Sequence, residues 1–171
     1  MSADLERVVG VLVPGGVRFI LIGGWAAALH GSARSTMDVD LVYARSHDNI
    51  RALVAALRSH KPYLRGAPLG LPFLFDERTV RMGLNFTLSS ELGNLDLLGE
   101  VPGGGSYENL LPRSEQVEAF GHRFHVVDLM TLIHLKRAAG RPKDLEPIAE
   151  LEALLEERRR LEARGEIPGG G

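Results

Sequence analysis

The sequence contains no cysteine. Disulfide bonds and thiolate metal sites are therefore excluded, although this absence does not by itself identify a cellular compartment. Charge of one sign is not in excess either, because 20 Lys and Arg residues against 22 Asp and Glu residues leave a formal net charge of −2. A chain with this balance has no overall basic field that would attract nucleic acid, but a local basic patch is compatible with it.

Long hydrophobic runs are also missing. The apolar stretch from Ile20 to Leu29 is too short to span a bilayer, and Pro14-Gly15-Gly16 and Arg18 prevent its extension. Residues Met1–Glu6 contain no basic segment of the kind that starts a secretory signal. We therefore expect a cytoplasmic protein without a membrane partner.

Several motifs that would identify other enzyme classes are absent. The sequence has no Walker-type Gly-Lys-Ser/Thr and no Gly-x-Ser-x-Gly elbow, which argues against a P-loop kinase and against a hydrolase with that elbow. The glycines of Val101–Ser106 do not have dinucleotide-binding spacing. His122 and His125 lie in an expected hairpin rather than at the helical spacing of a zinc pair, so we interpret both as structural, and His30 as a helix-end residue.

The length of 171 residues, with 44% hydrophobic and 25% charged residues, predicts one soluble globular domain. Apolar spacing and turn-forming residues predict helices at 5–12, 25–30, 49–57, 129–139 and 143–164, and strands at 17–22, 38–43, 73–75, 79–88, 94–98, 116–120 and 123–127. Asp128 is suited to cap the helix that follows it, and Gly140 is suited to end that helix.

One short stretch contains the densest set of candidate functional residues. Asp38 and Asp40 are two positions apart, so on a strand their side chains project from the same face. Val39 and Leu41 supply apolar positions that an internal strand would bury. Two carboxylates this close raise each other's pKa, and a divalent cation relieves the repulsion. Both aspartates are therefore candidate ligands of Mg²⁺, which prefers carboxylate oxygens and leaves positions for substrate phosphates.

The residues before this strand are suited to phosphate. Gly23 and Gly24 follow the apolar run Phe19–Ile22 and precede the helix-forming segment Trp25–Leu29. Without Cβ atoms, such a turn lets a ligand approach the backbone, and a helix start offers free N–H groups to an anion. We therefore predict a nucleotide site, with the triphosphate at the helix start and the metal at the adjacent strand.

The spacing of these residues resembles a known signature. Gly23-Gly24, a short spacer and Asp-x-Asp in an apolar strand are similar to the signature of the DNA polymerase beta-type nucleotidyltransferase superfamily. The fuller form, Gly-Gly-Trp-Ala, His-Gly and Arg-x-Thr-x-Asp-Val-Asp-Leu in that order, resembles its small AbiEii/AbiGii-type branch. That branch includes toxin components of toxin–antitoxin systems. The resemblance covers most of the chain, but its specificity is concentrated here.

The resemblance implies an α/β (α+β) fold, with a mixed twisted sheet, flanking helices and a helical C-terminal segment. Residues 1–127 would form the nucleotidyltransferase core, and residues 128–171 would form a helical segment of the same domain that closes the cleft. Asp96 matches the position of the superfamily's third carboxylate, on a strand beside Asp38 and Asp40. The alternative is that Asp96 points into solvent from an edge strand.

Polar residues between the glycines and the aspartates are further candidates for nucleotide binding. Arg34 is suited either to pair with a phosphate oxygen or to hold Asp38 or Asp40 in place. Ser32 and Thr36 are suited to hydrogen-bond phosphate, or they contribute only the ordinary polarity of a loop.

A second segment resembles the late motif of the family, a helical Lys-x-x-Ala followed by Arg-x-Lys-Asp. By this resemblance Lys136 would meet the triphosphate, or the base and ribose, as a point charge. Asp144 would orient Lys136, Lys143 or the nucleotide, or would simply cap the last helix.

Together these residues and the resemblance predict an enzyme that transfers a nucleoside monophosphate from a nucleoside triphosphate to an acceptor hydroxyl. Two Mg²⁺ ions, replaceable by Mn²⁺, would be held by Asp38, Asp40 and Asp96. The acceptor can be tRNA, a protein or a small molecule, and the nucleotide, with ATP as one candidate, is not specified. Two alternatives stay open: a toxin with an antitoxin partner that uses the same chemistry, and a binding module that has kept the fold and lost catalysis.

Overall fold

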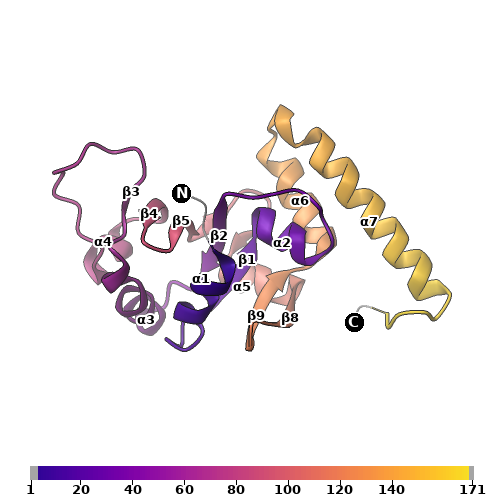
Figure 1. Cartoon of the computed structure of the whole chain (residues 1–171), viewed down its shortest axis with the longest axis horizontal. Helices are drawn as coiled ribbons and strands as arrows, with labels where there is room; N and C mark the ends of the chain where they lie inside the picture. The colour runs from indigo at the N-terminus through magenta and orange to yellow at the C-terminus, as the bar shows by residue number, and fades with distance from the viewer. Residues whose placement is uncertain (1–3, 170–171) are drawn as a thin grey trace.

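A seven-stranded mixed sheet forms the centre of the computed structural model, which describes residues 4–169 (Figure 1). The strand order is β3-β4-β5-β2-β1-β9-β8. The strands are β1 (Phe19–Ile22), β2 (Asp38–Tyr43), β3 (Tyr63–Leu64), β4 (Asn85–Ser90), β5 (Gly93–Leu98), β8 (Ser114–Ala119) and β9 (His122–Val127). A separate small ladder pairs β6 (Glu100–Val101) with β7 (Gly105–Ser106).

Helices lie around this sheet, and the two long helices of the C-terminal part contact each other at one end of it (Figure 1). The α-helices are α1 (Leu5–Leu12), α2 (Gly23–Leu29), α3 (His47–Leu57), α4 (Glu77–Met82), α5 (Tyr107–Leu110), α6 (Leu129–Ala139) and α7 (Leu145–Ala163). Short 3₁₀ turns occupy Arg58–His60, Leu111–Arg113 and Pro142–Asp144. The mixed sheet, the flanking helices and the C-terminal helix confirm the predicted α/β fold class.

Strand β2 has one apolar face and one acidic face. It pairs with β1 in the antiparallel sense and with β5 in the parallel sense, so it is internal to the sheet. Val39 and Leu41 are fully buried, whereas the alternate positions Asp38 and Asp40 are only partly buried. Because successive side chains on a strand point to opposite faces, one face of β2 joins the core and the other presents two carboxylates.

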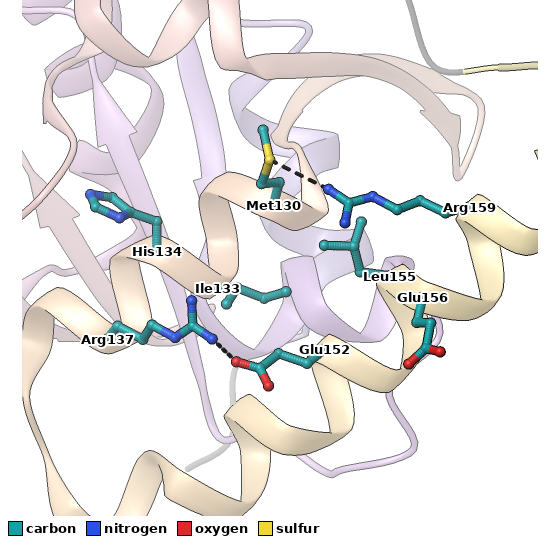
Figure 2. Close-up of a pocket in the computed structure, with 8 residues that line it drawn as sticks. All are labelled: Met130, Ile133, His134, Arg137, Glu152, Leu155, Glu156 and Arg159. Carbon is teal, nitrogen blue, oxygen red and sulfur yellow. Dashed lines mark hydrogen bonds and ion pairs between the residues drawn. The ribbon is translucent and has the colours of Figure 1, made fainter.

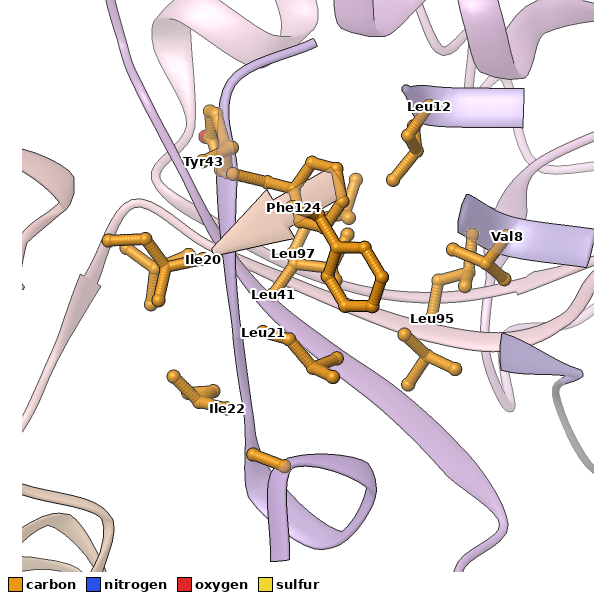
Figure 3. Packing of buried hydrophobic residues seen from close by; sticks show 14 of the residues in the cluster. Val8, Leu12, Ile20, Leu21, Ile22, Leu41, Tyr43, Leu95, Leu97 and Phe124 are labelled. Carbon is orange, nitrogen blue, oxygen red and sulfur yellow. The ribbon is translucent and has the colours of Figure 1, made fainter. Parts of the chain in front are cut away.

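The hydrophobic core packs the apolar face of the sheet against α1 (Figure 3). Leu41 of β2 and Leu95 and Leu97 of β5 are fully buried, as are Val8 and Leu12 of α1. This burial fixes the register of β2 and β5, since a slip of one residue would bring the carboxylates into the core and the leucines into solvent.

Two expectations for the middle of the chain are wrong. Phe73–Phe75 lies in a loop instead of a strand, and the first part of 79–88 belongs to α4. The Asp76 side chain accepts a hydrogen bond from the Thr79 backbone N–H at 2.8 Å and so caps the start of α4. At the other end of α4, Arg45 Nη2 donates to the Arg81 carbonyl oxygen at 2.9 Å. A contact between residues this far apart leaves no pattern in the local sequence. The apolar residues of 79–88 were therefore interpreted as one strand.

The C-terminal helices follow their predicted boundaries closely. Asp128 Oδ1 accepts a hydrogen bond from the Thr131 N–H at 2.7 Å and caps α6, and Gly140 ends it in the left-handed conformation with a φ of 65°. The last helix begins at Leu145, two residues later than predicted, because Pro142–Asp144 forms a 3₁₀ turn. None of the helices in residues 4–169 is both long and apolar enough to cross a membrane.

Candidate active site

Three carboxylates meet on one face of two neighbouring parallel strands. Asp40 of β2 is in register with Asp96 of β5, and Asp38 is in register with Asn94. Paired strands lie roughly 4.8 Å apart, so side chains on the same face at paired positions are neighbours. Asp96 is therefore beside Asp40 on an internal strand, which contradicts the alternative of an exposed edge-strand aspartate.

Asp40 is the carboxylate enclosed by the other two. Burial raises its pKa from 3.8 to about 8, with the hydrogen bond to Asp96 and the negative charges of Asp96 and Asp38 acting in the same direction. Lys136 is the group that opposes this shift in pKa. Asp40 Oδ1 is buried and has no hydrogen-bond partner within residues 4–169. An acceptor oxygen in this state is costly for a folded chain unless a proton or a cation reaches it.

The two glycines pack directly against the carboxylate strand. The predicted turn is in fact the first turn of α2, which begins at Gly23. Gly23 has a φ of 72°, and a Cβ atom there would overlap the carboxylate of Asp40. A Cβ atom on Gly24 would lie 2.7 Å from Cβ of Thr36. Both positions therefore need glycine for close packing, and α2 starts immediately beside Asp40 because no side chain separates them.

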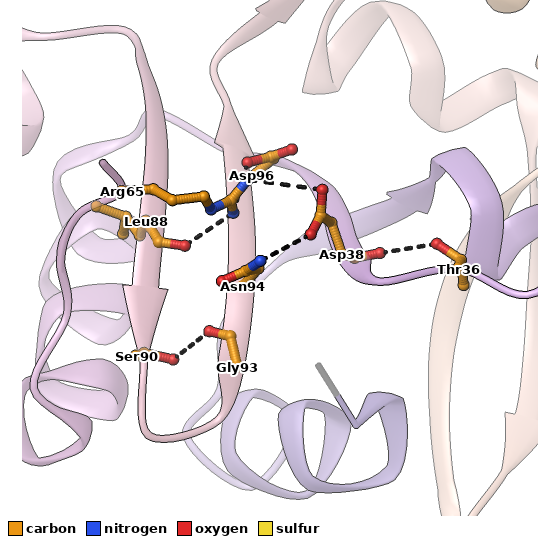
Figure 4. Close-up of polar contacts among 8 residues, drawn as sticks. All are labelled: Thr36, Asp38, Arg65, Leu88, Ser90, Gly93, Asn94 and Asp96. Carbon is orange, nitrogen blue, oxygen red and sulfur yellow. Dashed lines mark hydrogen bonds and ion pairs between the residues drawn. The ribbon is translucent and has the colours of Figure 1, made fainter. Parts of the chain in front are cut away.

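Arg65 lies between two of the carboxylates (Figure 4). Its Nη2 is 3.0 Å from Oδ1 of Asp96, and its Nη1 is 3.5 Å from Oδ2 of Asp38. The Asp38 carboxylate also accepts a hydrogen bond from Asn94 Nδ2 at 3.1 Å. Arg65 follows the edge strand β3, and two strands separate it in the sheet from β2, so only the folded sheet brings it to this site.

A cavity of about 240 Å³ opens beside Asp40. It is enclosed by the start of α2, the loop before β2, the end of α6 and one side of α7. Its lining contains seven of the ten predicted site residues: Gly23, Gly24, Ser32, Arg34, Thr36, Asp40 and Lys136. Ala27, Ser35, Arg141, Pro147, Glu150 and Leu151 complete the lining. The structure thus brings together residues that are more than 100 positions apart in the sequence.

Arg34 pairs with the C-terminal helix rather than with either aspartate of β2. Its Nε donates to Glu150 at 2.7 Å, and its Nη2 lies 3.0 Å from Glu146. The hydrogen bond from Arg34 lowers the pKa of Glu150. These contacts attach the loop before β2 to α7 across the mouth of the cavity.

The late motif is divided between the cavity and the turn that leads into α7. Lys136 lines the cavity with Asp40, whereas Asp144 is almost fully buried outside the set of residues that line it. The Asp144 carboxylate accepts a hydrogen bond from Arg141 Nε at 2.8 Å, so its predicted role as a side-chain cap of the last helix is wrong. Arg141 does reach the cavity, so Asp144 contacts a residue of the cavity lining without lining the cavity itself.

The histidines have structural partners. His30 Nε2 is 2.8 Å from the Val127 carbonyl oxygen, and His30 Nδ1 is 3.2 Å from Nη2 of Arg158 on α7. His125 Nδ1 lies 3.2 Å from the Ser114 hydroxyl oxygen. His30 thus links α2, β9 and α7, which agrees with its interpretation as a helix-end residue.

A larger hollow of about 580 Å³ lies between α6 and α7 (Figure 2). It is lined by Met130, Ile133, His134, Arg137, Glu152, Leu155, Glu156 and Arg159, none of which is a predicted site residue. Arg137 and Glu152 form an ion pair across it. Its residues come from the two helices alone, so it is separate from the carboxylate strands.

The donor set at β2 and β5 fits a hard divalent cation, although the present side-chain positions do not yet enclose one. Asp40 Oδ1 and Asp96 Oδ1 are both buried without a hydrogen-bond partner among the described residues, and carboxylate oxygens are the ligands that Mg²⁺ takes. In the same part of the chain, no three His, Asp or Glu side chains are grouped so as to hold one ion. The Asp38 carboxylate is instead engaged by Arg65 and Asn94.

No protein-family model matches the sequence, and no curated protein matches it. Among solved structures, the chain is similar to the lincosamide antibiotic adenylyltransferase LnuA in its lincomycin-bound form, with a TM-score of 0.58 and 16% identity. The likeness covers 90% of this chain and 98% of LnuA. It shows that the chain has the nucleotidyltransferase fold. A protein from Thermotoga maritima described as a nucleotidyltransferase also matches, with 14% identity and coverage of 88% and 92%, but its TM-score of 0.49 is too low to support a conclusion.

Sequence analysis missed five polar residues of the site: Ser35, Arg65, Asn94, Arg141 and Glu150. Asn94 had a usable signal, because it is two positions before Asp96 on the same strand and therefore on the same face. Arg141 stood in the quoted late motif but was given no role. Arg65 and Glu150 had no usable signal in the sequence, because each reaches the site through a long side chain from a distant element.

Proposed function

We propose that the chain is a divalent-metal-dependent nucleotidyltransferase, which transfers a nucleoside monophosphate from a nucleoside triphosphate to an acceptor hydroxyl and releases pyrophosphate. The observation that supports this most strongly is the meeting of Asp40 and Asp96 beside a cavity that also contains Gly24 and Lys136. Acidic and basic groups thus face each other across a space suited to a polyphosphate and its counterions.

The cavity residues would bind and orient the triphosphate. The ammonium group of Lys136 would neutralise phosphate oxygens, and the backbone N–H groups of Gly23 and Gly24, which line the same cavity at the start of α2, would donate to them. The hydroxyl groups of Ser32 and Thr36, which line the same cavity, would supply further donors. For Arg34 to contact a phosphate, its side chain would have to leave Glu146 and Glu150.

Asp38, Asp40 and Asp96 would hold the metal, for which we propose two Mg²⁺ ions with Mn²⁺ as a substitute. When bound, the metal supplies charge neutralisation of the triphosphate and of the developing oxyanion. In the transfer itself, the acceptor oxygen forms a bond to the α-phosphorus while the bond to the oxygen that bridges to the β-phosphorus breaks. Asp96 would receive the proton of the acceptor hydroxyl, and pyrophosphate would leave with the broken bond's electron pair.

The acceptor belongs to one of three classes: a small molecule, tRNA or a protein. LnuA, which shares the fold, is a lincosamide adenylyltransferase, and this favours including small antibiotics with free hydroxyl groups among the acceptors tested. A toxin role with an antitoxin partner would use the same site, and it is distinguished by the acceptor that becomes labelled. A binding module that has kept the fold and lost catalysis would bind the nucleotide but would not transfer it to any acceptor.

The test is incubation of the protein with each α-³²P-labelled nucleoside triphosphate, Mg²⁺ and, separately, cell extract, purified tRNA or a panel of small hydroxylated antibiotics. We expect label from one or more nucleotides to appear on a defined acceptor, and we expect Asp38→Ala to abolish it. The exposed Asp48→Asn serves as a matched control that removes one carboxylate elsewhere. Equal labelling by wild type and Asp38→Ala, or no labelling with any acceptor, would contradict the proposal.

A further inference from the structure

Arg65 differs from the other cations of the site because it contacts the carboxylates themselves. Its guanidinium group spans Asp96 of β5 and Asp38 of β2, at 3.0 Å and 3.5 Å (Figure 4). The side chains of Arg65 and Asp96 are each 24% exposed, so this pairing is partly shielded from water and its electrostatic attraction is screened less than that of a surface ion pair.

The backbone of Arg65 is fixed while its guanidinium group is incompletely bonded. The Arg65 N–H donates to the Thr87 carbonyl oxygen at 3.0 Å, and Nη2 donates to the Leu88 carbonyl oxygen at 2.8 Å. In contrast, Arg65 Nε is buried without a hydrogen-bond partner among residues 4–169. The contact to Asp96 Oδ1 is close but poorly aligned for a hydrogen bond, since that oxygen is also unpartnered within the described chain. A guanidinium group held in this way lacks the paired, parallel hydrogen bonds of a strong Arg–carboxylate contact.

Arg65 also determines which carboxylates are available to a metal. Asp38 and Asp96 are the two that it contacts, whereas Asp40, which is in register with Asp96, forms no ion pair with Arg65 within residues 4–169. The positive charge of the guanidinium group therefore stands where a cation shared by Asp38 and Asp96 would stand. While it is there, the three carboxylates cannot converge on one ion.

We propose that Arg65 is a positioning residue that serves as a built-in counterion for Asp38 and Asp96, and that a divalent cation binds by displacing its guanidinium group from these two carboxylates. Arg65 then keeps the acidic face of the sheet folded when no metal is bound and competes with the metal when it is. This inference rests on the proposed function only in taking the carboxylates as a divalent-cation site.

The test measures Mn²⁺ affinity of the full chain by electron paramagnetic resonance of free Mn²⁺, without nucleotide. Removal of a competing positive charge should tighten binding, so Arg65→Gln should bind Mn²⁺ about tenfold more tightly than wild type. Arg65→Lys keeps the positive charge but not the planar guanidinium group, and its affinity for Mn²⁺ should fall between those of wild type and Arg65→Gln. Arg123→Gln, which removes an exposed arginine paired with Glu118, should leave the affinity unchanged. In the absence of metal, Arg65→Gln should melt at a lower temperature than wild type.

A second measurement follows metal binding to the wild-type protein and needs no Arg65→Gln, in case that variant does not fold. The ¹H–¹⁵N resonance of Arg65 Nε, assigned by its loss in Arg65→Lys, should shift on addition of Mg²⁺ with the same midpoint as metal binding. A resonance that does not move, or an unchanged or weaker Mn²⁺ affinity in Arg65→Gln, overturns the inference. If Arg65 had a purely structural role, its substitution would lower the melting temperature without increasing the affinity for Mn²⁺.

The two proposals fail separately. If Mn²⁺ binds and Arg65→Gln tightens it, but no nucleotide is transferred to any acceptor, the proposed function is wrong and the counterion role is supported. If wild type transfers nucleotide with Mg²⁺ while Arg65→Gln shows wild-type Mn²⁺ affinity, the counterion role is wrong and the proposed function stands. If the wild-type chain binds no Mn²⁺, both are overturned.

Discussion

Asp40 connects the burial of a single side chain to the dependence of stability on pH. Its pKa is raised to about 8 in the folded chain, mainly by burial and also by Asp96 and Asp38. Between about pH 4 and pH 8 the folded protein retains a proton that the unfolded chain has lost. Because the folded state then binds more protons than the unfolded state, the free energy of unfolding decreases as pH rises through this window.

We therefore expect the metal-free protein to become less stable from pH 5 to pH 9, and Asp40→Asn to remove most of this loss. At pH 9 the substitution should stabilise the metal-free fold by a few kcal/mol, since each pKa unit corresponds to about 1.4 kcal/mol. Urea denaturation in the presence of a chelator at pH 5, 7 and 9 measures this. Asp48→Asn, at an exposed position of α3, is the control, and a wild-type stability that rises over the same range would contradict the sign.

Asp96 provides a prediction on activity at the same scale. If it receives the proton of the acceptor hydroxyl and helps to hold the metal, Asp96→Asn should lower the rate of nucleotide transfer by about a hundred- to ten-thousandfold. The fold should persist, because Asn occupies the same volume. Single-turnover rates with labelled nucleotide, beside circular dichroism of both proteins, test this. A rate within a few fold of wild type would show that Asp96 is not part of the reaction.

The acidic face of β2 and β5 is the part of the site that the sequence could predict. Asp38 and Asp40 alternate with the buried Val39 and Leu41, and that alternation is local and regular enough to indicate a strand with a carboxylate face. Arg65 was not predictable in this way, because nothing near it in the sequence indicates that β3 lies at the end of a strand order that brings it to Asp96. The roles of the individual residues in nucleotide binding stay predictions.

At the scale of elements, the glycines determine how α2 sits on β2. Local sequence rules favour glycine at a turn, yet Gly24 lies inside the helix and is required by its closeness to Thr36. Gly24→Ala should therefore destabilise the protein by about 1 to 3 kcal/mol, the usual cost of overpacking. Gly10→Ala is the matched control, since a Cβ atom there meets nothing within 4 Å among the described residues.

In Gly10→Ala the exposed helix position should instead gain a fraction of a kcal/mol, up to about 1 kcal/mol. Chemical denaturation of the two variants decides between packing and simple helix propensity. Equal effects of the two substitutions would mean that the contact between α2 and the loop before β2 is looser than described. In that case the start of α2 would not be held against Asp40.

At the scale of the whole molecule, α7 completes the cavity with few buried contacts. Leu151 is the one residue of α7, within the described chain, that is almost fully buried, and it lines the cavity. Polar contacts add to it, from Arg34 to Glu150 and from Arg158 to His30. The position of the C-terminal helix over the site thus depends on one almost fully buried leucine, on the partly buried Ile148, Leu154 and Leu155, and on charged side chains near the surface.

Leu151→Ala should accordingly cost about 2 to 5 kcal/mol of local stability and should speed hydrogen exchange of the α7 amides. Nucleotide affinity should fall as well, because α7 forms one wall of the cavity. Leu145→Ala on the same helix is the control, since Leu145 is 71% exposed and its loss should change neither quantity. If Leu151→Ala speeds hydrogen exchange only in α7 and leaves the nucleotide affinity unchanged, this helix is not part of the binding site.

Anomalous diffraction from crystals of the full chain, grown with Mn²⁺ and a non-hydrolysable nucleoside triphosphate, tests most directly whether the carboxylates bind a metal beside a triphosphate. We expect an anomalous peak in contact with carboxylate oxygens of Asp40 and Asp96, and triphosphate density in the cavity beside Gly24 and Lys136. Manganese bound elsewhere, or a triphosphate that lies outside that cavity, would contradict it.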